Sequence, residues 1–309
     1  MNIKVTKNNN NNIYKMDKKN KPILEISIKN ILEIETLDCF HDQIKVDNYV
    51  LEKLDFSAVN PATGPIYIKE AKVGDILAVK IEKIEIAQYG ILVSSNLLGT
   101  LKEQVSESEV KLIEIKDGKA KISENIYVDL NPMIGVIGVA PMNEGIICGT
   151  PDYHGGNMDT KEIKENSVVY FRVNVDGALF GLGDLHAAMG DGEISGTGIE
   201  VGGNVTLSFK LIKGETFPTP AVKSGDNDSI VFLYSDESLD IAADKATKQC
   251  YKFLTENLNL EKHLAIRYMS ISGDLGISQI VDPKKTAKFT LDLNPLRGID
   301  AKVFNKFNL

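Results

Sequence analysis

Hydrophobic and polar residues alternate with a period of two along much of the chain. The alternation is clear in residues 24–28, 32–35, 169–175 and 205–211. Because successive side chains of a β-strand point to opposite faces, each segment predicts a strand with one buried face.

Two local irregularities refine this pattern. In residues 76–86, Val79 and Ile81 share a face, and Ile84 resumes the apolar series three residues later. Such a slip is typical of a β-bulge, in which one strand carries an extra residue. Asp117-Gly118 separates two β-compatible runs and predicts a tight hairpin turn.

Helical spacing is clear only late in the chain. Residues 239–254 repeat apolar side chains at i, i+3, i+4 and i+7, with Ser238 as the expected N-cap. A second helix is expected to begin near Asn259. Together these patterns predict a mainly β protein: an antiparallel, jelly-roll-like β-sandwich with a few helices toward the C-terminus.

The length of 309 residues suits one domain with a sizeable core. We expect a single domain over residues 1–309, in which residues 216–309 form an α+β part packed on the β core. Residues 1–22 include five consecutive asparagines and many lysines, so this segment buries little apolar surface and can be loose. We favour a strand with a permissive loop insertion there.

Composition limits the partners and the compartment. A net charge of −8 without a basic face beyond the N-terminus argues against nucleic acid. No apolar run is long enough for a bilayer, and no apolar leader follows the first lysines, so neither a membrane partner nor secretion is expected. The three cysteines are widely spaced, which indicates a reducing compartment and predicts a cytoplasmic protein.

The most unusual stretch is residues 131–203. It contains His154 and His186 among carboxylates, and eight glycines fall within residues 181–203. These glycines do not indicate a phosphate-binding loop, because no Gly-Lys-Ser/Thr follows and the next element is a strand pattern. We interpret His41 and His263 as structural residues, since neither has such surroundings.

The spacing of carboxylates and histidines in this stretch suits a divalent cation. Asp184 and His186 are two residues apart, so both point the same way on a strand, and Asp191 and Glu193 repeat the spacing. A cation with an open coordination position lowers the pKa of bound water, and a nearby carboxylate can then take the proton. Backbone N–H groups of glycines could stabilise an oxyanion. This chemistry permits amide hydrolysis without identifying it.

Several ordered blocks of the sequence resemble the acetamidase/formamidase family, over roughly residues 30–285. The blocks are residues 38–40 with 43–44, 60–65, 74–75, 131–135 with 140–141, 149–151, 154–159, 183–193 with 200, 273–275 and 279–283. The resemblance implies a β-rich sandwich, self-association as a homodimer or higher homo-oligomer, and a divalent metal, zinc or alternatively calcium. It also implies hydrolysis of small linear amides of the formamide and acetamide type to a carboxylate and ammonia.

The resemblance also indicates where the site residues lie. The matching positions are Asp38, Asn60, Thr63, Gly64, His154, Asp159, Asp184, His186, Asp191, Glu193 and Glu200. On residue type and spacing, we assign His154, Asp184 and His186 as metal ligands, with Asp38 and Asp159 as further candidates. Glu193 is the expected general base, with Asp191 second, and Asn60, Thr63 and Gly64 are the expected substrate-binding residues.

The sequence argues against two of three rival interpretations. The chain lacks the Gly-Gly-Ser-Ser-Gly-Gly type stretch of the amidase-signature enzymes. A nitrilase-like mechanism would need a reactive cysteine, and Cys148 is expected to be a small buried residue instead. The remaining alternative is a non-catalytic β-sandwich module that binds a cation or small ligand; closed coordination would favour the module, and an open position would favour the hydrolase.

Overall fold

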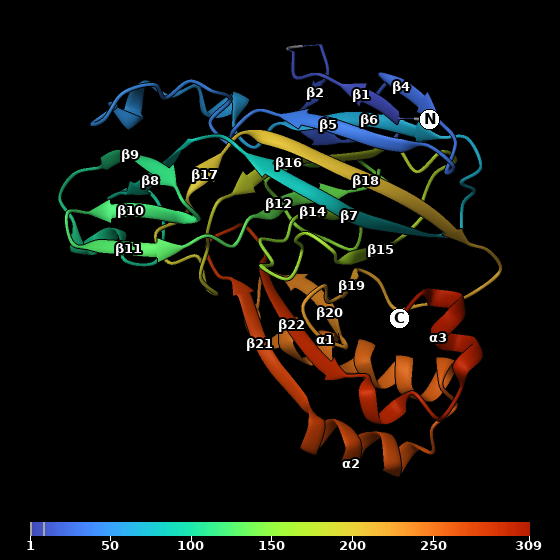
Figure 1. Ribbon diagram of the computed structural model, residues 1–309. Coiled ribbons are helices and arrows are strands. Elements are labelled where there is room, and N and C mark those ends of the chain that lie inside the picture. The colour runs from blue at the N-terminus through green and yellow to red at the C-terminus, as the bar shows by residue number, and fades with distance from the viewer. Residues whose placement is uncertain (1, 9) are drawn as a thin grey trace.

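A computed structural model of the protein describes residues 2–8 and 10–309, so Asn9, within the asparagine run, lies outside the described residues. Two large β-sheets pack face to face, and the helices lie beyond one end of them (Figure 1). Their shared core combines Leu32 and Val79 of the first sheet with Ile134 and Leu182 of the second, all fully buried. The period-two stripes therefore supply the apolar layer between the sheets.

The first sheet has nine strands in the order β1-β5-β18-β7-β15-β19-β20-β22-β21. Their bounds are β1 Asn2–Val5, β5 Ile31–Thr36, β7 Ile76–Ile86, β15 Val168–Arg172, β18 Gly203–Ile212, β19 Ala221–Lys223, β20 Ser229–Asp236, β21 Gly273–Gln279 and β22 Lys285–Asp292. The sheet is continuous from the N-terminal strand to the strands that carry the helices.

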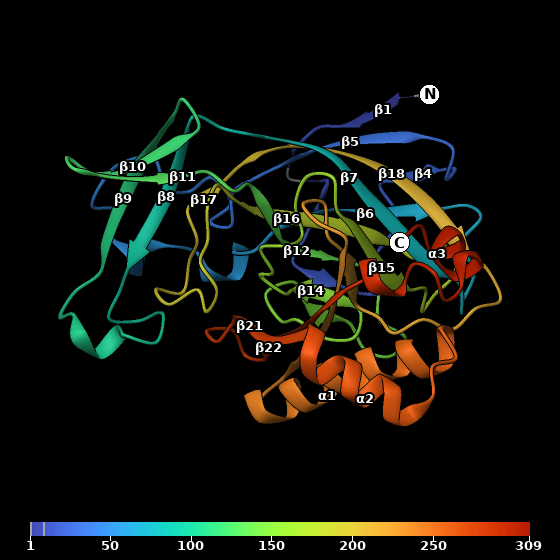
Figure 2. The same cartoon turned by 60° about the horizontal axis from the view of Figure 1, so that its bottom comes forward.

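The second sheet contains the strands nearest the candidate site, and a small two-stranded sheet, β13-β3, accompanies it. Its path is β11-β10-β9-β8-β17-β16-β12-β14, and β6 joins it through β16 and also pairs with β2 and β4. The bounds are β2 Asn12–Ile13, β3 Lys15–Met16, β4 Leu24–Ile26, β6 Ala62–Ile68, β8 Tyr89–Ser94, β9 Glu109–Lys116, β10 Lys119–Ser123, β11 Ile126–Asp129, β12 Met133–Gly138, β13 Ile146–Ile147, β14 Gly155–Asn157, β16 Phe180–His186 and β17 Glu200–Val201. Strands β8 to β11 project sideways from the body (Figure 2).

Both local irregularities read from the sequence are present. Opposite β18, the register of β7 shifts between Lys83 and Ile81, so Glu82 is the extra residue of a bulge. Lys116 pairs with Lys119 across Asp117-Gly118. Both turn residues have positive φ, 50° and 75°, which matches the twist of a two-residue hairpin.

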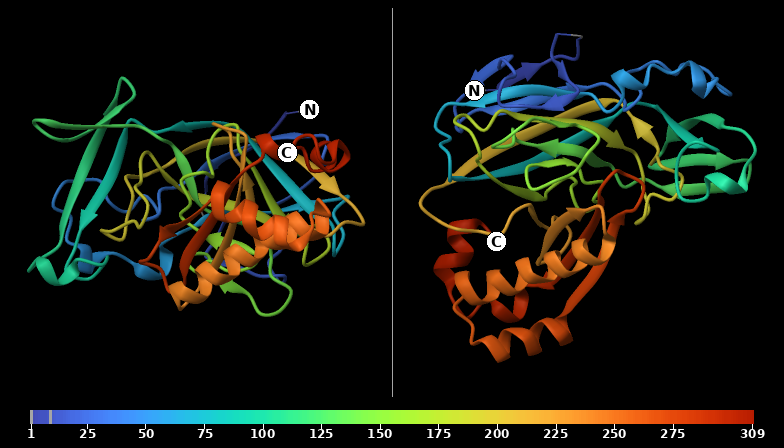
Figure 3. Two further views of the ribbon diagram at one scale, coloured as in Figure 1. Left: turned by 90° about the horizontal axis from the view of Figure 1, so that it is seen from below. Right: turned by 180° about the vertical axis from the view of Figure 1, so that it is seen from behind.

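The α-helices of the described residues all follow residue 238, as predicted. They are α1 Leu239–Lys252, continued by a π-helical turn Phe253–Asn257, α2 Lys262–Ser272 and α3 Ala301–Phe307. Ser238 caps α1 by accepting a hydrogen bond from the Ile241 N–H, and Glu261 caps α2 in the same way. The figures show α1 and α2 side by side, covering β20, β21 and β22 (Figure 3).

The prediction of a mainly β, antiparallel protein with late helices is confirmed. Two strand pairs depart from the antiparallel rule, because β1 runs parallel to β5 and β4 runs parallel to β6. The jelly-roll topology and the division into one domain stay predictions. No helix among the described residues combines the length and apolar composition needed to cross a lipid bilayer.

Candidate functional site

The candidate site is a buried cluster of one histidine and four carboxylates. The Nε2 atom of His186 lies 3.2 Å from Glu200 Oε2 and 3.5 Å from Asp184 Oδ1. It lies 3.7 Å from Asp159 Oδ1 and 4.0 Å from Glu193 Oε1. Each of these five side chains is at least nine-tenths buried. The carboxylate oxygens therefore converge on one small volume in front of one imidazole nitrogen.

Strand pairing and turns bring these side chains together. Asp184 and His186 stand two residues apart on β16, and His186 pairs directly with Glu200 on β17. Asp159 follows β14, and Glu193 comes from the loop between β16 and β17. Asp159, Asp184 and Glu193 have positive φ values of 41°, 56° and 50°. Such backbone conformations persist only where the surrounding structure holds them, and they concentrate at functional sites.

The negative charge of the buried carboxylates in the cluster has to be balanced by a bound cation or by protonation. Burial raises the pKa of Asp159 and of Glu193 well above the usual range for carboxyl groups. Burial raises the pKa of Glu200 to about 7, although His186 opposes the shift. Both oxygens of Asp159, Asp184 Oδ1 and Glu200 Oε2 have no hydrogen-bond partner within the described chain. Because buried charges are normally paired or coordinate metals, these oxygens could hold a metal ion.

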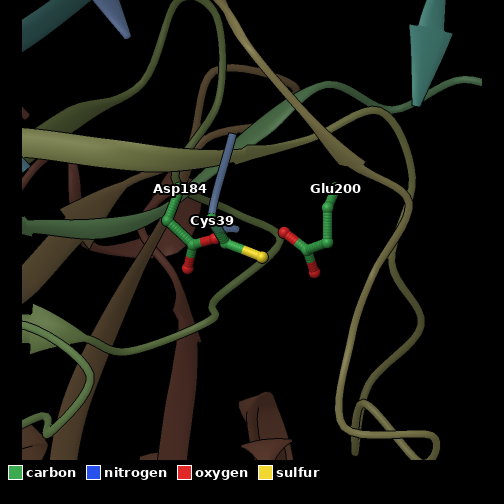
Figure 4. A group of neighbouring side chains, drawn as sticks. All are labelled: Cys39, Asp184 and Glu200. Carbon is green, nitrogen blue, oxygen red and sulfur yellow. The ribbon is translucent and has the colours of Figure 1, made fainter. Parts of the chain in front are cut away.

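Cys39 adds a sulfur donor beside the same carboxylates. Ligand atoms of Cys39, Asp184 and Glu200 lie within 4.8 Å of one another, and those of Asp159, His186 and Glu193 form a second such group. Figure 4 shows the Cys39 sulfur pointing toward the Glu200 carboxylate, with Asp184 beside it. Burial raises the pKa of the Cys39 thiol well above its usual value, and the neighbouring Glu200 and Asp184 carboxylates add to the shift.

A cavity of about 380 Å³ opens onto the cluster. Asp184, Glu193 and Glu200 form part of its lining, together with Asn60 and Asn157. The Asn157 amide donates to Asp282 Oδ2 over 3.0 Å, and Asp282 also borders the cavity. The carboxylates are therefore accessible to a small molecule that enters this cavity.

A family model of the acetamidase/formamidase family matches residues 3–146 and 143–280. The chain belongs to the acetamidase/formamidase family. The crystal structure of an acetamidase from Bacillus halodurans superposes with a TM-score of 0.92 at 43% identity, covering 97% of this chain and 99% of that one. A predicted acetamidase/formamidase from Thermoanaerobacter tengcongensis gives the same TM-score, 0.92, at 42% identity over 97% and 99% of the two chains.

Sequence relatives are matched over shorter stretches. A formamidase from Methylophilus methylotrophus is 33% identical over 140 residues, which cover 42% of this chain and 31% of that protein. A Schizosaccharomyces pombe protein whose name also gives formamidase is matched over 59% of its length. In these alignments the chain thus spans less than two thirds of either relative's length. The family resemblance seen in the sequence is confirmed.

The structure brings together only part of the site that the sequence suggested for this family member. Asp159, Asp184, His186 and Glu193 meet, whereas His154 is buried elsewhere, with Asp152 and Lys284 as its charged neighbours. Burial lowers the pKa of His154 to about 4, so its imidazole is neutral. Gly155 and Gly156, both with positive φ, lie between His154 and Asp159 in the chain.

Asp38 and Asp191 also lie outside the cluster. Asp38 accepts the Asp42 N–H over 2.8 Å and borders a different cavity. Asp191 is paired with Lys288 at 2.7 Å and with Lys161 at 2.9 Å, and its side chain is 37% exposed. The two-residue spacing of Asp191 and Glu193 did not place them together, because these residues lie in a loop and not in a strand.

Asn60 alone of the three expected substrate-binding residues lines the cavity, with a positive φ of 50°. The Thr63 hydroxyl donates to the Glu35 carbonyl over 3.0 Å, and the Gly64 N–H donates to Asn11 over 2.8 Å. Thr63 and Gly64 therefore have structural contacts at β6 and are absent from the cavity lining.

Sequence reasoning did not single out Cys39, Asn157 or Asp282, and it listed Glu200 as a matching position without giving it a role. All four lie inside the blocks that carry the family resemblance, so their position was a signal that could have been used. Their chemistry alone was not a signal, because single Cys, Asn and acidic residues are common away from active sites. Their convergence depends on four separate segments of the chain.

Gly135 on β12 leaves the space that the carboxylates occupy. A Cβ atom at this position would collide with Asp159 Oδ1 and lie 2.6 Å from Asp184 Oδ2. Gly135→Ala is expected to reduce metal affinity and amidase activity 10- to 100-fold, the range for changes just outside a metal site. Bound metal and ammonia release measure the effect. Gly298→Ala, where an added Cβ meets nothing within 4 Å, is the control; equal behaviour of the two variants would contradict the prediction.

Proposed function

We propose that this protein hydrolyses the C–N bond of linear amides, releasing a carboxylate and ammonia. The observation that carries the proposal is the set of buried carboxylates around His186 at the end of a cavity of about 380 Å³. Family membership supports the reaction class, because relatives are named acetamidase and formamidase. Function belongs to the site and not to the fold, so the chemistry is derived from these residues.

The cluster fits a divalent metal, and zinc in particular. Ligand atoms held 2.0–2.2 Å from a tetrahedral zinc lie about 3.3–3.6 Å apart. The distances of 3.2 to 3.7 Å from His186 Nε2 to Glu200, Asp184 and Asp159 are close to that range. A nitrogen donor and the nearby Cys39 sulfur favour zinc over calcium, which prefers oxygen ligands. When bound, such an ion supplies Lewis acidity, which polarises a carbonyl group and makes water more acidic.

Glu193 is the proposed general base. Its carboxylate is the farthest of the four from His186 Nε2, at 4.0 Å, and it borders the cavity. Burial raises its pKa above that of an exposed glutamate, which makes the ionised carboxylate a stronger base. Glu193 takes a proton from the attacking water while the new C–O bond forms. It then delivers that proton to the amide nitrogen, which leaves as ammonia when the C–N bond breaks.

Asn60 is the proposed substrate-orienting residue. It borders the cavity beside Gly149 and the cluster residues, and its side chain offers both a donor and an acceptor to a primary amide. Asn157 also borders the cavity: its amide donates to Asp282, and its Oδ1 has no hydrogen-bond partner among the described residues.

A cysteine mechanism is not supported by this arrangement. The Cys148 thiol is buried, donates to the Ile13 carbonyl over 3.5 Å, and has its pKa raised to about 12 by burial. Among the described residues, Cys148 is absent from the cavity lining. The hydrolytic water and the Glu193 carboxylate therefore carry the proposal.

Ammonia release tests the proposal most directly. The protein would be incubated with formamide, acetamide and propionamide before and after chelation, and again with zinc restored. We expect release that chelation abolishes and zinc recovers. Tight zinc binding without release from any amide would favour the non-catalytic binding module. Release that survives complete removal of metal would contradict the metal assignment while leaving the reaction class intact.

A further inference from the structure

The cavity beside the cluster has an apolar side. Besides the carboxylates, its lining includes Phe40, Phe56, Val59, Leu97, Leu98, Ile147 and Val281. Formamide has no carbon chain to contact such a surface, and acetamide has a single methyl group. The lining therefore contains more apolar surface than either amide can cover.

Part of this apolar wall is fixed by the protein core. Phe40 is 4% exposed and packs in a hydrophobic cluster with Ile44 and Leu51, and Val59 and Leu98 pack against that cluster. A wall supported in this way is formed before a ligand arrives, so binding does not have to order it.

The exposed part of the cavity lining contains three large apolar side chains beside Lys102. Phe56 and Leu97 are each 47% exposed, and Ile147 is 58% exposed. Covering such side chains with the carbon chain of a ligand is favourable, by about fourfold in affinity for each methylene removed from water. The cavity volume of about 380 Å³ lies within the range of about 300–1,000 Å³ that is found for pockets binding drug-sized ligands. Acetamide, which has only four heavy atoms, is much smaller than such ligands.

We propose that the preferred substrates are primary amides with an acyl chain of at least four carbons. This inference rests on the proposed amide hydrolysis. The leaving nitrogen must face Glu193, which delivers its proton, so the nitrogen lies on the cluster side of the cavity. The group on the other side of the carbonyl carbon then extends toward Phe40, Val59 and Leu97.

A neighbouring apolar cavity offers a matched comparison. It has a volume of about 540 Å³ and shares Leu98, Glu193 and Thr197 with the first, so the two cavities adjoin. Leu101 lines only this second cavity, whereas Leu97 lines only the first. Both leucines are exposed, at 59% and 47%, so replacing either by alanine should leave the fold intact.

The experiment measures kcat/KM for formamide, acetamide, butyramide and hexanamide with the zinc-loaded wild type, Leu97→Ala and Leu101→Ala. For the wild type we expect kcat/KM to rise at least tenfold from acetamide to hexanamide. Leu97→Ala should lower the value for hexanamide three- to tenfold and change that for acetamide less than twofold. Leu101→Ala should change neither.

Other outcomes separate this inference from the proposed function. Hydrolysis of all four amides with equal or falling kcat/KM would overturn the chain-length preference and leave amide hydrolysis standing. An effect of Leu101→Ala in place of Leu97→Ala would overturn the assignment of the acyl chain to this cavity. No hydrolysis of any amide would overturn the proposed function itself. Light scattering on each variant tests whether the exposed leucines contact substrate or hold an oligomer together. If a variant loses both its oligomeric state and its activity toward every amide, a substrate contact is contradicted.

Discussion

Glu193→Gln is expected to lower kcat for amide hydrolysis by about 10²–10⁴-fold, the usual contribution of a positioned general base. Glutamine keeps the size of the side chain but cannot accept the proton of the attacking water. The bound zinc should be retained, because His186, Asp184 and Glu200 remain as donors and glutamine keeps a side-chain oxygen at the position of Glu193. Steady-state ammonia release and metal analysis of the same samples measure both quantities.

Asp191→Asn is the matched control for this variant. Asp191 lies two residues away and is the other base that the sequence suggested, but it pairs with Lys161 and Lys288 outside the cluster. Its replacement should change kcat less than threefold, and Lys288 keeps Glu162 as a partner at 2.8 Å. The assignment of the base is wrong if Asp191→Asn loses activity and Glu193→Gln retains it.

His186→Ala is expected to remove bound zinc and to lower activity by at least about 10²-fold, the upper range for changes that only touch a metal's outer shell. The imidazole is the nitrogen donor on which Glu200, Asp184 and Asp159 converge. Without it, the remaining donors are a thiol with a raised pKa and carboxylates that repel one another. Zinc content after extensive dialysis and acetamide turnover measure the loss.

His154→Ala separates a ligand from a buried structural histidine. His154 is fully buried, neutral, and neighboured by Asp152 and Lys284. We expect this variant to melt at a lower temperature, because it leaves a cavity, but to bind one equivalent of zinc and to retain turnover. Loss of zinc from His154→Ala with an unchanged melting temperature would restore His154 to the ligand set and contradict the site described here.

Much of the fold was predictable because its signals are local. A strand with one buried face, the bulge at Glu82, the Asp117-Gly118 turn and the Ser238 cap each depend on a few adjacent residues. The pairing of distant strands was not predictable in this way. Nothing in residues 2–5 specifies parallel pairing with residues 31–34, because register is decided by which apolar faces meet in the folded core.

The site was predictable where strand geometry held and not where loops intervened. Asp184 and His186 keep the expected side-by-side arrangement on β16. The same spacing argument was wrong for Asp191 and Glu193. A positive φ at Glu193 accompanies a side chain that points into the cluster, whereas Asp191 lies outside it. Asp282 arrives from a segment more than 80 residues from Glu200 in the printed sequence, and spacing rules carry no information over such separations.

The left-handed backbone at Asp159, Asp184 and Glu193 has a consequence for engineering this protein. Each such conformation costs about 1–3 kcal/mol, and buried like charges add to that cost. Substitutions selected only for heat resistance should therefore accumulate at these positions, because glycine or asparagine adopts the left-handed conformation with less strain. Such variants would be more thermostable but inactive. A screen for thermostable forms of this enzyme therefore needs turnover as a second criterion from its first round.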